Sequence, residues 1–172
     1  MTASNFPYCL HTILTWEGGF VNLPSDPGGA TNLGITLATF LEWKPNGTVD
    51  DLKALTPSDP LVIQIYQTDY WSMVRCDDLP SGVDLICFDT AVNNGSHRAA
   101  LWLQEACGVK ADGMIGPVTL AAVAAHKASD LIDKIRAMRL AFDLSLPTWG
   151  TFGHGWSRRL ADVTAKAHNL AQ

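Results

Sequence analysis

The chain reads Trp16-Glu17-Gly18-Gly19-Phe20 at the point where its first helical pattern ends. Before this stretch, Phe6, Leu10 and Ile13 recur at helical spacing, and Glu17 falls on the same apolar stripe. We expect a helix that begins near Phe6, includes Glu17 and stops at the two glycines. A carboxyl group on an apolar stripe loses hydration, which would raise its pKa.

Glu17 has two interpretations. A carboxyl group that stays protonated can donate a proton to the leaving oxygen of a glycosidic bond. Alternatively, Glu17 is an ordinary glutamate at a frayed helix end and points to water. The residue pattern by itself favours the second interpretation.

Glycoside cleavage normally needs a second carboxylate, and Asp26 is the nearest candidate. It follows Glu17 across a stretch rich in turn-forming residues, and its alternative role is to start the turn at Asp26-Pro27-Gly28-Gly29. Thr31 and Asn32 carry hydroxyl and amide groups that are suited to holding a water molecule, or they are ordinary loop residues.

The rest of the chain contains helical patterns, with neither alternating strands nor a long linker. We therefore predict an all-α single domain with a small irregular or β-containing lobe near residues 20–35. The last helix is expected from about Trp156 to Leu170, after a glycine-rich connection. Earlier helix starts are indicated at Thr36, Thr56-Pro57, Ser81-Gly82-Val83-Asp84, Ser96, Gly116-Pro117 and Ser129.

The composition and charge of the chain argue against several classes of partner and binding site. A net charge of −5 disfavours nucleic acid and anionic membranes as partners, and no apolar run approaches the roughly 18–20 residues of a membrane span. The N-terminus lacks the pattern of a signal peptide, so we expect synthesis in the cytoplasm and release by another component. His, Cys and carboxylate residues show no metal-ligand spacing, and we expect neither a metal nor a cofactor.

A sugar-binding groove needs aromatic faces and amide groups. Tyr66, Tyr70 and Trp71 lie on one predicted helix, although aromatic residues at this spacing more often belong to a core. Asn93 and Asn94 precede Gly95 and offer amides suited to N-acetyl groups, or they simply end a helix. All five are candidate substrate-binding residues.

The stretch from Trp16 to Asn22, followed by Ser25 to Thr36, closely resembles the opening of glycoside hydrolase family 108. This family comprises N-acetylmuramidases, several from phages and prophages. Further matches cover essentially the whole chain: Tyr70-Trp71, Leu79-Pro80, Phe88-Asp89-Thr90-Ala91-Val92-Asn93-Asn94-Gly95, Leu103-Gln104, Gly108-Val109 and Asp112 to Thr119.

The resemblance implies that Glu17 is the catalytic acid of a lysozyme-like helical domain. The spacing of Glu17 and Asp26 is also similar to the glutamate–aspartate–threonine signature of phage-type lysozymes. The threonine of this signature falls on Asn32, and Thr31 stands one residue early, so both stay candidates for the third group.

Residues 103–123 resemble the repeats of peptidoglycan-binding modules. The resemblance therefore implies a muramidase half, 1–95, and a peptidoglycan-binding-like half, 96–172, packed into the same globule. We expect a monomer that cuts the β-1,4 bond between N-acetylmuramic acid and N-acetylglucosamine in peptidoglycan glycan strands, after release by a holin or a secretion system. The alternatives are a lytic transglycosylase and a non-catalytic wall-binding or secretion-helper protein.

Overall fold

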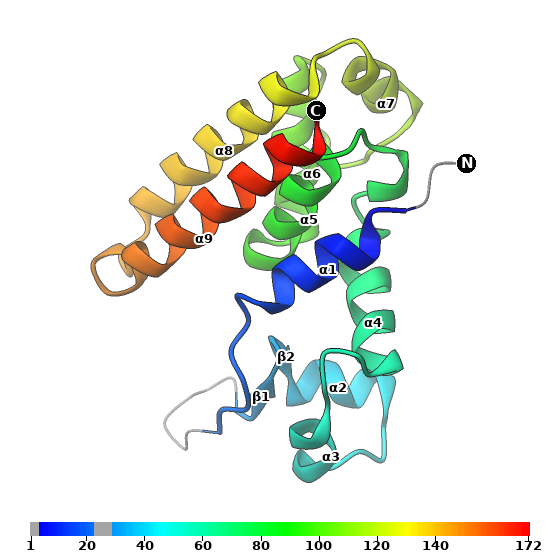
Figure 1. The fold of residues 1–172 in the computed structure, drawn as a ribbon, viewed down its shortest axis with the longest axis vertical. Coiled ribbons are helices and arrows are strands. Elements are labelled where there is room, and N and C mark those ends of the chain that lie inside the picture. Colours follow the sequence, from blue (N-terminus) through cyan, green and yellow to red (C-terminus); the bar gives the residue numbers. More distant parts are fainter. Residues whose placement is uncertain (1–3, 23–28) are drawn as a thin grey trace. The chain divides into compact units, whose positions relative to one another are not determined.

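A computed structural model describes residues 4–22 and 29–172, and its fold is all-α and lysozyme-like with a small sheet, as predicted (Figure 1). The described elements, in chain order, are α1 (Phe6–Leu14), β1 (Thr31–Asn32), β2 (Ile35–Thr36), α2 (Leu37–Trp43), α3 (Val49–Ala54), α4 (Pro60–Tyr66), η1 (Gln67–Trp71), η2 (Cys76–Asp78), α5 (Val83–Asn94), α6 (Ser96–Cys107), α7 (Pro117–Ala124), α8 (Ala128–Ser145) and α9 (Trp149–Leu170).

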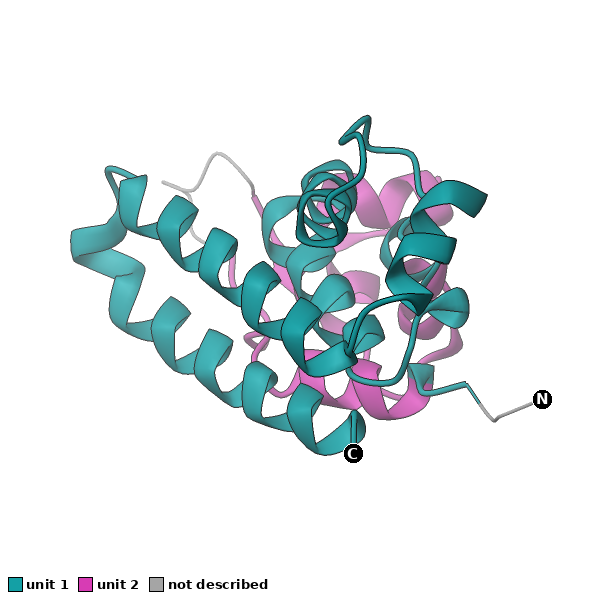
Figure 2. Cartoon of the chain, turned by 90° about the horizontal axis from the view of Figure 1, so that it is seen from above, with its two compact units in different colours: residues 1–6, 69–172 teal, residues 7–68 magenta. Residues whose placement is uncertain are grey.

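The chain divides into two compact units (Figure 2). The smaller unit is Pro7–Thr68, and the larger unit consists of Met1–Phe6 with Asp69–Gln172. The units therefore separate at residue 68, inside the predicted muramidase half, and the predicted halves 1–95 and 96–172 stay a prediction.

The first helix is shorter than expected. Helix α1 ends at Leu14, and Glu17 lies in the turn that follows. The backbone N–H groups of Trp16 and Glu17 both donate to the carbonyl oxygen of Ile13, at 2.9 and 3.2 Å. This tightened last turn is a common way to satisfy the unpaired carbonyls of a helix end, and it places Glu17 at the exit of the helix.

The predicted β-containing lobe is confirmed as a two-stranded antiparallel hairpin. Strand β1 pairs with β2 in the register Thr31↔Thr36 and Asn32↔Ile35. The two residues of the connecting turn, Leu33 and Gly34, both have positive φ, 51° and 74°. This is the turn type whose twist matches that of the flanking strands, and glycine adopts it without strain.

Local capping decides where the helices of the smaller unit begin. Thr36 caps α2 as predicted, and its side chain accepts a bond from Thr39 N. The expected start at Thr56-Pro57 is wrong, because Asp59 caps α4 and Pro60 takes its first position. Helix α3 was not predicted from the sequence, although Thr48 and Asp51 form a complete capping box at its start.

Helix α5 is the centre of the larger unit. Every residue from Val83 to Ala91 is buried, and α5 packs against α6, α8 and α9, the last two running side by side (Figure 1). The helix start predicted at Ser81-Gly82-Val83-Asp84 is confirmed, although no side chain caps it. Gly82, with φ 87°, is the cap, and Asp84 accepts bonds from the N–H groups of Gly82 and Leu85, both at 2.7 Å.

The glycine-rich connection before residue 156 is helical rather than a loop. Helix α9 begins at Trp149, so it includes Gly150 to Gly155. A Cβ on Gly153 would lie 2.5 Å from the indole of Trp149, so the glycine makes room for this ring against the helix. Among the described residues, no helix is both long and apolar enough to span a membrane.

Candidate active site

The Glu17 carboxylate lies against the backbone of the hairpin turn. A Cβ built on Gly34 would be 2.7 Å from Glu17 Oε2 and 2.7 Å from the hydroxyl oxygen of Tyr66. The acid, the phenol and a bare stretch of backbone therefore converge at one point of the smaller unit. Glu17 itself is half-buried, as expected for a group that must both reach a substrate and be shielded from bulk water.

Backbone pairing explains this convergence. Val21 and Thr31 exchange two N–H···O bonds of 2.8 Å, and Leu33 N donates to Gly18 O at 3.2 Å. The segment that follows Glu17 is thus aligned with the hairpin, and the alignment brings the Leu33–Gly34 turn next to the carboxylate. The second carboxylate candidate, Asp26, lies outside the described residues.

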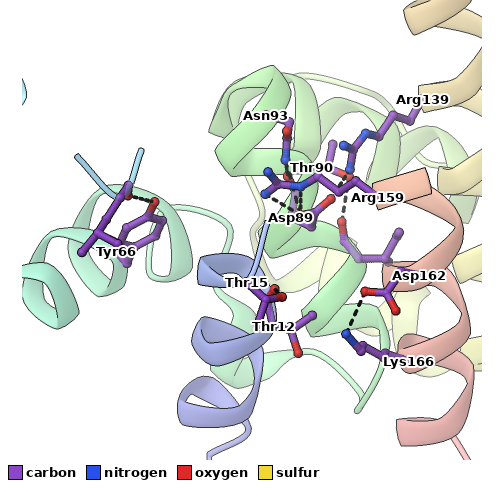
Figure 3. A network of polar contacts seen from close by, with 12 residues as sticks. Thr12, Thr15, Tyr66, Asp89, Thr90, Asn93, Arg139, Arg159, Asp162 and Lys166 are labelled. Atoms are coloured by element: carbon purple, nitrogen blue, oxygen red, sulfur yellow. Dashed lines mark hydrogen bonds and ion pairs between the residues drawn. The ribbon is translucent and has the colours of Figure 1, made fainter. Parts of the chain in front are cut away.

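Tyr66 is placed differently from the prediction. It is 1% exposed, and its hydroxyl donates to the carbonyl oxygen of Leu33 at 2.7 Å (Figure 3). A buried ring offers no face for a sugar to stack on, and the role of Tyr66 in substrate binding stays a prediction. Tyr66 instead fixes the turn that borders Glu17, a long-range contact that no local pattern signals.

The side chain of Asn32 has a structural role. It is 4% exposed, and its side-chain nitrogen donates to the carbonyl oxygens of Leu52, Lys53 and Leu55 at 2.9, 3.3 and 3.1 Å. These carbonyls lie at the C-terminal end of α3, where helix carbonyls lack intrahelical donors, and the carbonyl of Leu52 also accepts from Leu55 N at 3.2 Å. Thr31 is half-buried and, as its neighbour on β1, points to the opposite face of the strand.

The remaining candidates belong to the larger unit. Trp71 is 1% exposed and meets Phe6 and Phe88 edge-on, at centroid distances of 5.2 and 5.3 Å. Trp71 is thus a core residue, and its contact with substrate stays a prediction. Tyr70 is half-buried in η1. Asn93, at the end of α5, is exposed and donates to Asp89 O at 2.7 Å.

A buried ion cluster underlies this end of α5 (Figure 3). Asp89, completely buried, accepts from Arg139 and from Arg159, the latter through Nε at 2.8 Å. Burial alone would raise the pKa of Asp89, but the two guanidinium charges outweigh it and lower the pKa. The sequence offered one signal for this cluster, an aspartate inside the apolar run Phe88-Asp89-Thr90.

Comparison with known proteins agrees with this geometry. The family model for glycosyl hydrolase 108 matches residues 10–95. The chain belongs to this family. A second model, described as a predicted peptidoglycan domain, matches residues 98–161. The hydrolase is also similar to the solved structure of Brucella abortus SagA, with 41% identity over 98% of this chain and 96% of that chain and a TM-score of 0.86. No curated protein matches it.

These matches make the chain a glycoside hydrolase whose substrate is peptidoglycan, and they confirm the family suggested by its motifs. The described residues contain no group of three or more His, Cys, Asp or Glu side chains able to hold a metal ion.

Residues 98–161, which match the peptidoglycan-domain model, include a loop whose conformation is fixed by the side chain of Gln104. Its side-chain nitrogen donates to Asp112 Oδ1, Met114 O and Thr119 Oγ1 at 2.8, 3.1 and 3.2 Å. Its oxygen accepts from the N–H groups of Asp112 and Gly113 at 3.0 and 2.8 Å. The Leu-Gln…Asp-Gly…Gly-Pro pattern thus has a structural explanation.

The same loop borders an open pocket of about 420 Å³ in the larger unit. Met114 and Val118, both largely exposed, stand on its rim. The wall otherwise consists of Gln104, Val109, Lys110, Asp112, Gly116, Pro117 and Thr119.

Proposed function

We propose that this hydrolase cleaves the β-1,4 bond between N-acetylmuramic acid and N-acetylglucosamine, with Glu17 as the general acid. The observation that carries the proposal is the position of the Glu17 carboxylate, half-buried against Gly34 and the Tyr66 hydroxyl. A glycosidic oxygen leaves readily only when it receives a proton. Glu17 also falls on the glutamate of the Glu-Gly-Gly motif that the resemblance identifies as catalytic.

Asp26 is assigned to stabilise the oxocarbenium-like state or to orient water. Its support is the motif spacing alone, because Asp26 lies outside the described residues. For the third polar group Thr31 is preferred to Asn32, since the amide nitrogen of Asn32 already bonds three carbonyls of α3. Within the larger unit, Asn93, Asn94 and Tyr70 are assigned to contact the glycan.

The decisive experiment is lysis of purified peptidoglycan, followed by turbidity, with Glu17→Gln. We expect a loss of at least about a hundredfold, the usual contribution of a general acid. Glu42→Gln is the matched control. This substitution removes the same charge from an exposed position on α2, outside the residues that form the site. Lysis by the Glu17→Gln protein at the rate of the Glu42→Gln protein would refute the assignment.

Mass spectrometry of the products separates this proposal from the other reactions. Hydrolysis adds water and leaves a reducing N-acetylmuramic acid end, whereas a lytic transglycosylase leaves an anhydro sugar. A wild-type chain that binds the wall without releasing fragments would instead be a wall-binding or secretion-helper protein.

We place the enzyme on the cell wall, in the periplasm, after release from the cytoplasm by a holin or a secretion system, and acting as a monomer. The support is the resemblance to phage and prophage enzymes. Fractionation of producing cells with and without a holin, and light scattering of the purified protein, test the two parts separately.

A further inference from the structure

The hydroxyl group of Tyr66 has one proton, and the structure shows where this proton lies (Figure 3). The phenol oxygen is 2.7 Å from the carbonyl oxygen of Leu33, which has lone pairs and no proton. Tyr66 must therefore be the donor of this hydrogen bond. Its side chain is 1% exposed, so bulk water does not compete for the proton. What the phenol oxygen still offers to other neighbours is its lone pairs.

The carboxyl group of Glu17 is a neighbour of this phenol oxygen. A Cβ at Gly34 would stand 2.7 Å from Glu17 Oε2, 3.0 Å from Glu17 Cδ and 2.7 Å from the oxygen of Tyr66. The carboxyl group and the phenol thus border the same space, and all three residues belong to the smaller unit. Because position 34 has no side chain, nothing at this position separates the acid from the phenol.

The two protonation states of Glu17 fit this neighbour differently. An ionised carboxylate only accepts hydrogen bonds, so it would meet the lone pairs of Tyr66 with lone pairs of its own. A protonated carboxyl group has one O–H donor, which can use the lone pairs of the phenol. A hydrogen bond made by the neutral form of an acid favours that form. Glu17 is half-buried, so water offsets this difference only in part.

The neighbouring elements of the smaller unit contribute little charge. Strands β1 and β2 and helix α4 contain no Asp, Glu, Lys, Arg or His, and Asp59 caps the end of α4 opposite Tyr66. On α1, α2, α3 and the residue after α2, the titratable side chains are exposed or pair with one another: Tyr8, His11, Glu42, Asp50, Lys53 and the pair Lys44–Asp51. Tyr66 is therefore the titratable side chain that borders the Glu17 carboxyl group at the hairpin turn.

We propose that Tyr66 is a positioning residue for the proton of Glu17. In the free enzyme, the phenol oxygen accepts the O–H of the neutral carboxyl group and keeps Glu17 in the protonated form that the leaving oxygen of the glycan needs. Tyr66 itself neither gains nor loses a proton, because its own proton stays in the bond to Leu33. The inference rests on the proposed function for the use of this proton, and it gives the buried phenol a role beyond holding the turn.

The first test is the pH profile of lysis by the full chain at low wall concentration, where the rate reports the free enzyme. Tyr66→Phe keeps the ring and removes the oxygen. We expect the alkaline limb of its profile to lie about 0.5–1 pH unit below that of the wild type, which corresponds to one hydrogen bond to the neutral acid. Tyr8→Phe is the matched control, because Tyr8 is 44% exposed on α1, and its profile should coincide with that of the wild type. If Tyr66 only holds the turn, Tyr66→Phe will lower the rate by the same factor at every pH, and this result would overturn the proposal.

The second test is thermal melting and needs no catalysis. Glu17→Gln carries an amide, which keeps an N–H donor for Tyr66 at every pH. A contact that favours the neutral acid stabilises the wild type at low pH and is lost as the pH rises. From about pH 4 to pH 8, the melting temperature of the wild type should therefore fall by about 2–4 °C relative to that of Glu17→Gln. Glu42→Gln, the exposed control, should show no such trend, and the trend should vanish when Glu17→Gln is compared with Glu17 in the Tyr66→Phe background.

Parallel melting curves of the wild type and Glu17→Gln would overturn the proposal, and this comparison holds even if Tyr66→Phe does not fold. A trend that persists in the Tyr66→Phe background would overturn it as well, because burial of Glu17 would then be the cause. The proposed acid can fail separately. Lysis that survives Glu17→Gln, together with the expected melting trend, would refute the acid and leave the contact between Glu17 and Tyr66 standing.

Discussion

Gly34 lies directly against the carboxylate of Glu17: a Cβ at this glycine would stand 2.7 Å from Glu17 Oε2. The position also has a φ of 74°, which side chains other than glycine rarely adopt. The carboxylate therefore fits beside the turn only because position 34 has no side chain. Any side chain there must displace the carboxylate or the Tyr66 hydroxyl.

The first prediction concerns this match. Gly34→Ala should reduce lysis by about a hundredfold, because a displacement of about 1 Å in a catalytic group has an effect of that size. Gly108→Ala is the control: Gly108 has a similar φ of 70°, yet a Cβ there meets nothing within 4 Å. Both variants carry the same backbone strain, so equal activities in the turbidity assay would contradict the steric explanation.

The second prediction separates Asn32 from Thr31. Asn32→Ala should lower the free energy of unfolding by about 1–3 kcal/mol, because the carbonyls of Leu52, Lys53 and Leu55 lose the side-chain donor at the end of α3. Activity per folded molecule should stay within about threefold.

Thr31→Val tests the hydroxyl group of Thr31, since it keeps the shape of the side chain and removes the hydroxyl. We expect nearly unchanged melting and a loss of kcat of at least about tenfold if the hydroxyl holds the reacting water. Full activity of Thr31→Val combined with an inactive, stable Asn32→Ala protein would reverse the preference stated above.

The third prediction concerns the buried ion cluster. Asp89→Asn should lower the free energy of unfolding by about 3–5 kcal/mol, because it removes the buried carboxylate charge that Arg139 and Arg159 share. Denaturant unfolding measures the change. Asp78→Asn is the control, since Asp78 forms an exposed ion pair with Arg75 and should change the stability by at most about 1 kcal/mol.

The same cluster predicts a pH dependence. The pKa of Asp89 is lowered in the folded protein, so its stabilising contribution is complete above the ordinary value of about 3.9 and is lost as the pH falls below it. The stability of the wild type should therefore decrease more steeply than that of Asp89→Asn between about pH 4 and pH 2. Parallel curves would contradict this assignment.

The fourth prediction concerns the loop in the peptidoglycan-domain match. Gln104→Glu keeps the acceptors but removes the donors to Asp112, Met114 and Thr119, so we expect a loss of about 2 kcal/mol. Hydrogen exchange at the Gly113 amide should become faster. Glu105→Gln, the exposed neighbour, should change neither quantity, and unchanged exchange in Gln104→Glu would show that the loop is held by other contacts.

The sequence predicted those features that depend on neighbours along the chain. The cap at Thr36, the start of α7 at Pro117 and the β-containing lobe follow from local hydrogen bonding and from glycine conformations. The start predicted at Thr56-Pro57 is wrong, because Asp59-Pro60 has the same pattern three residues later and begins α4. The run from Gly150 to Gly155 was predicted as a connection, because the packing of Trp149 on Gly153 is not visible in a composition count.

By itself, the sequence determined the family and the all-α class, and it singled out Glu17 as the proposed acid, because a long ordered motif and helical periodicity are properties of the linear chain. Only the tertiary structure decided which side chains are buried and which partners they have. It buried Tyr66 beside the turn, assigned the amide of Asn32 to α3, placed Trp71 in the core and paired Asp89 with Arg139 and Arg159. Each of these roles depends on a partner that is distant in the chain. The residues next to such a side chain carry no signal of this partner, so the contact cannot be predicted from local sequence.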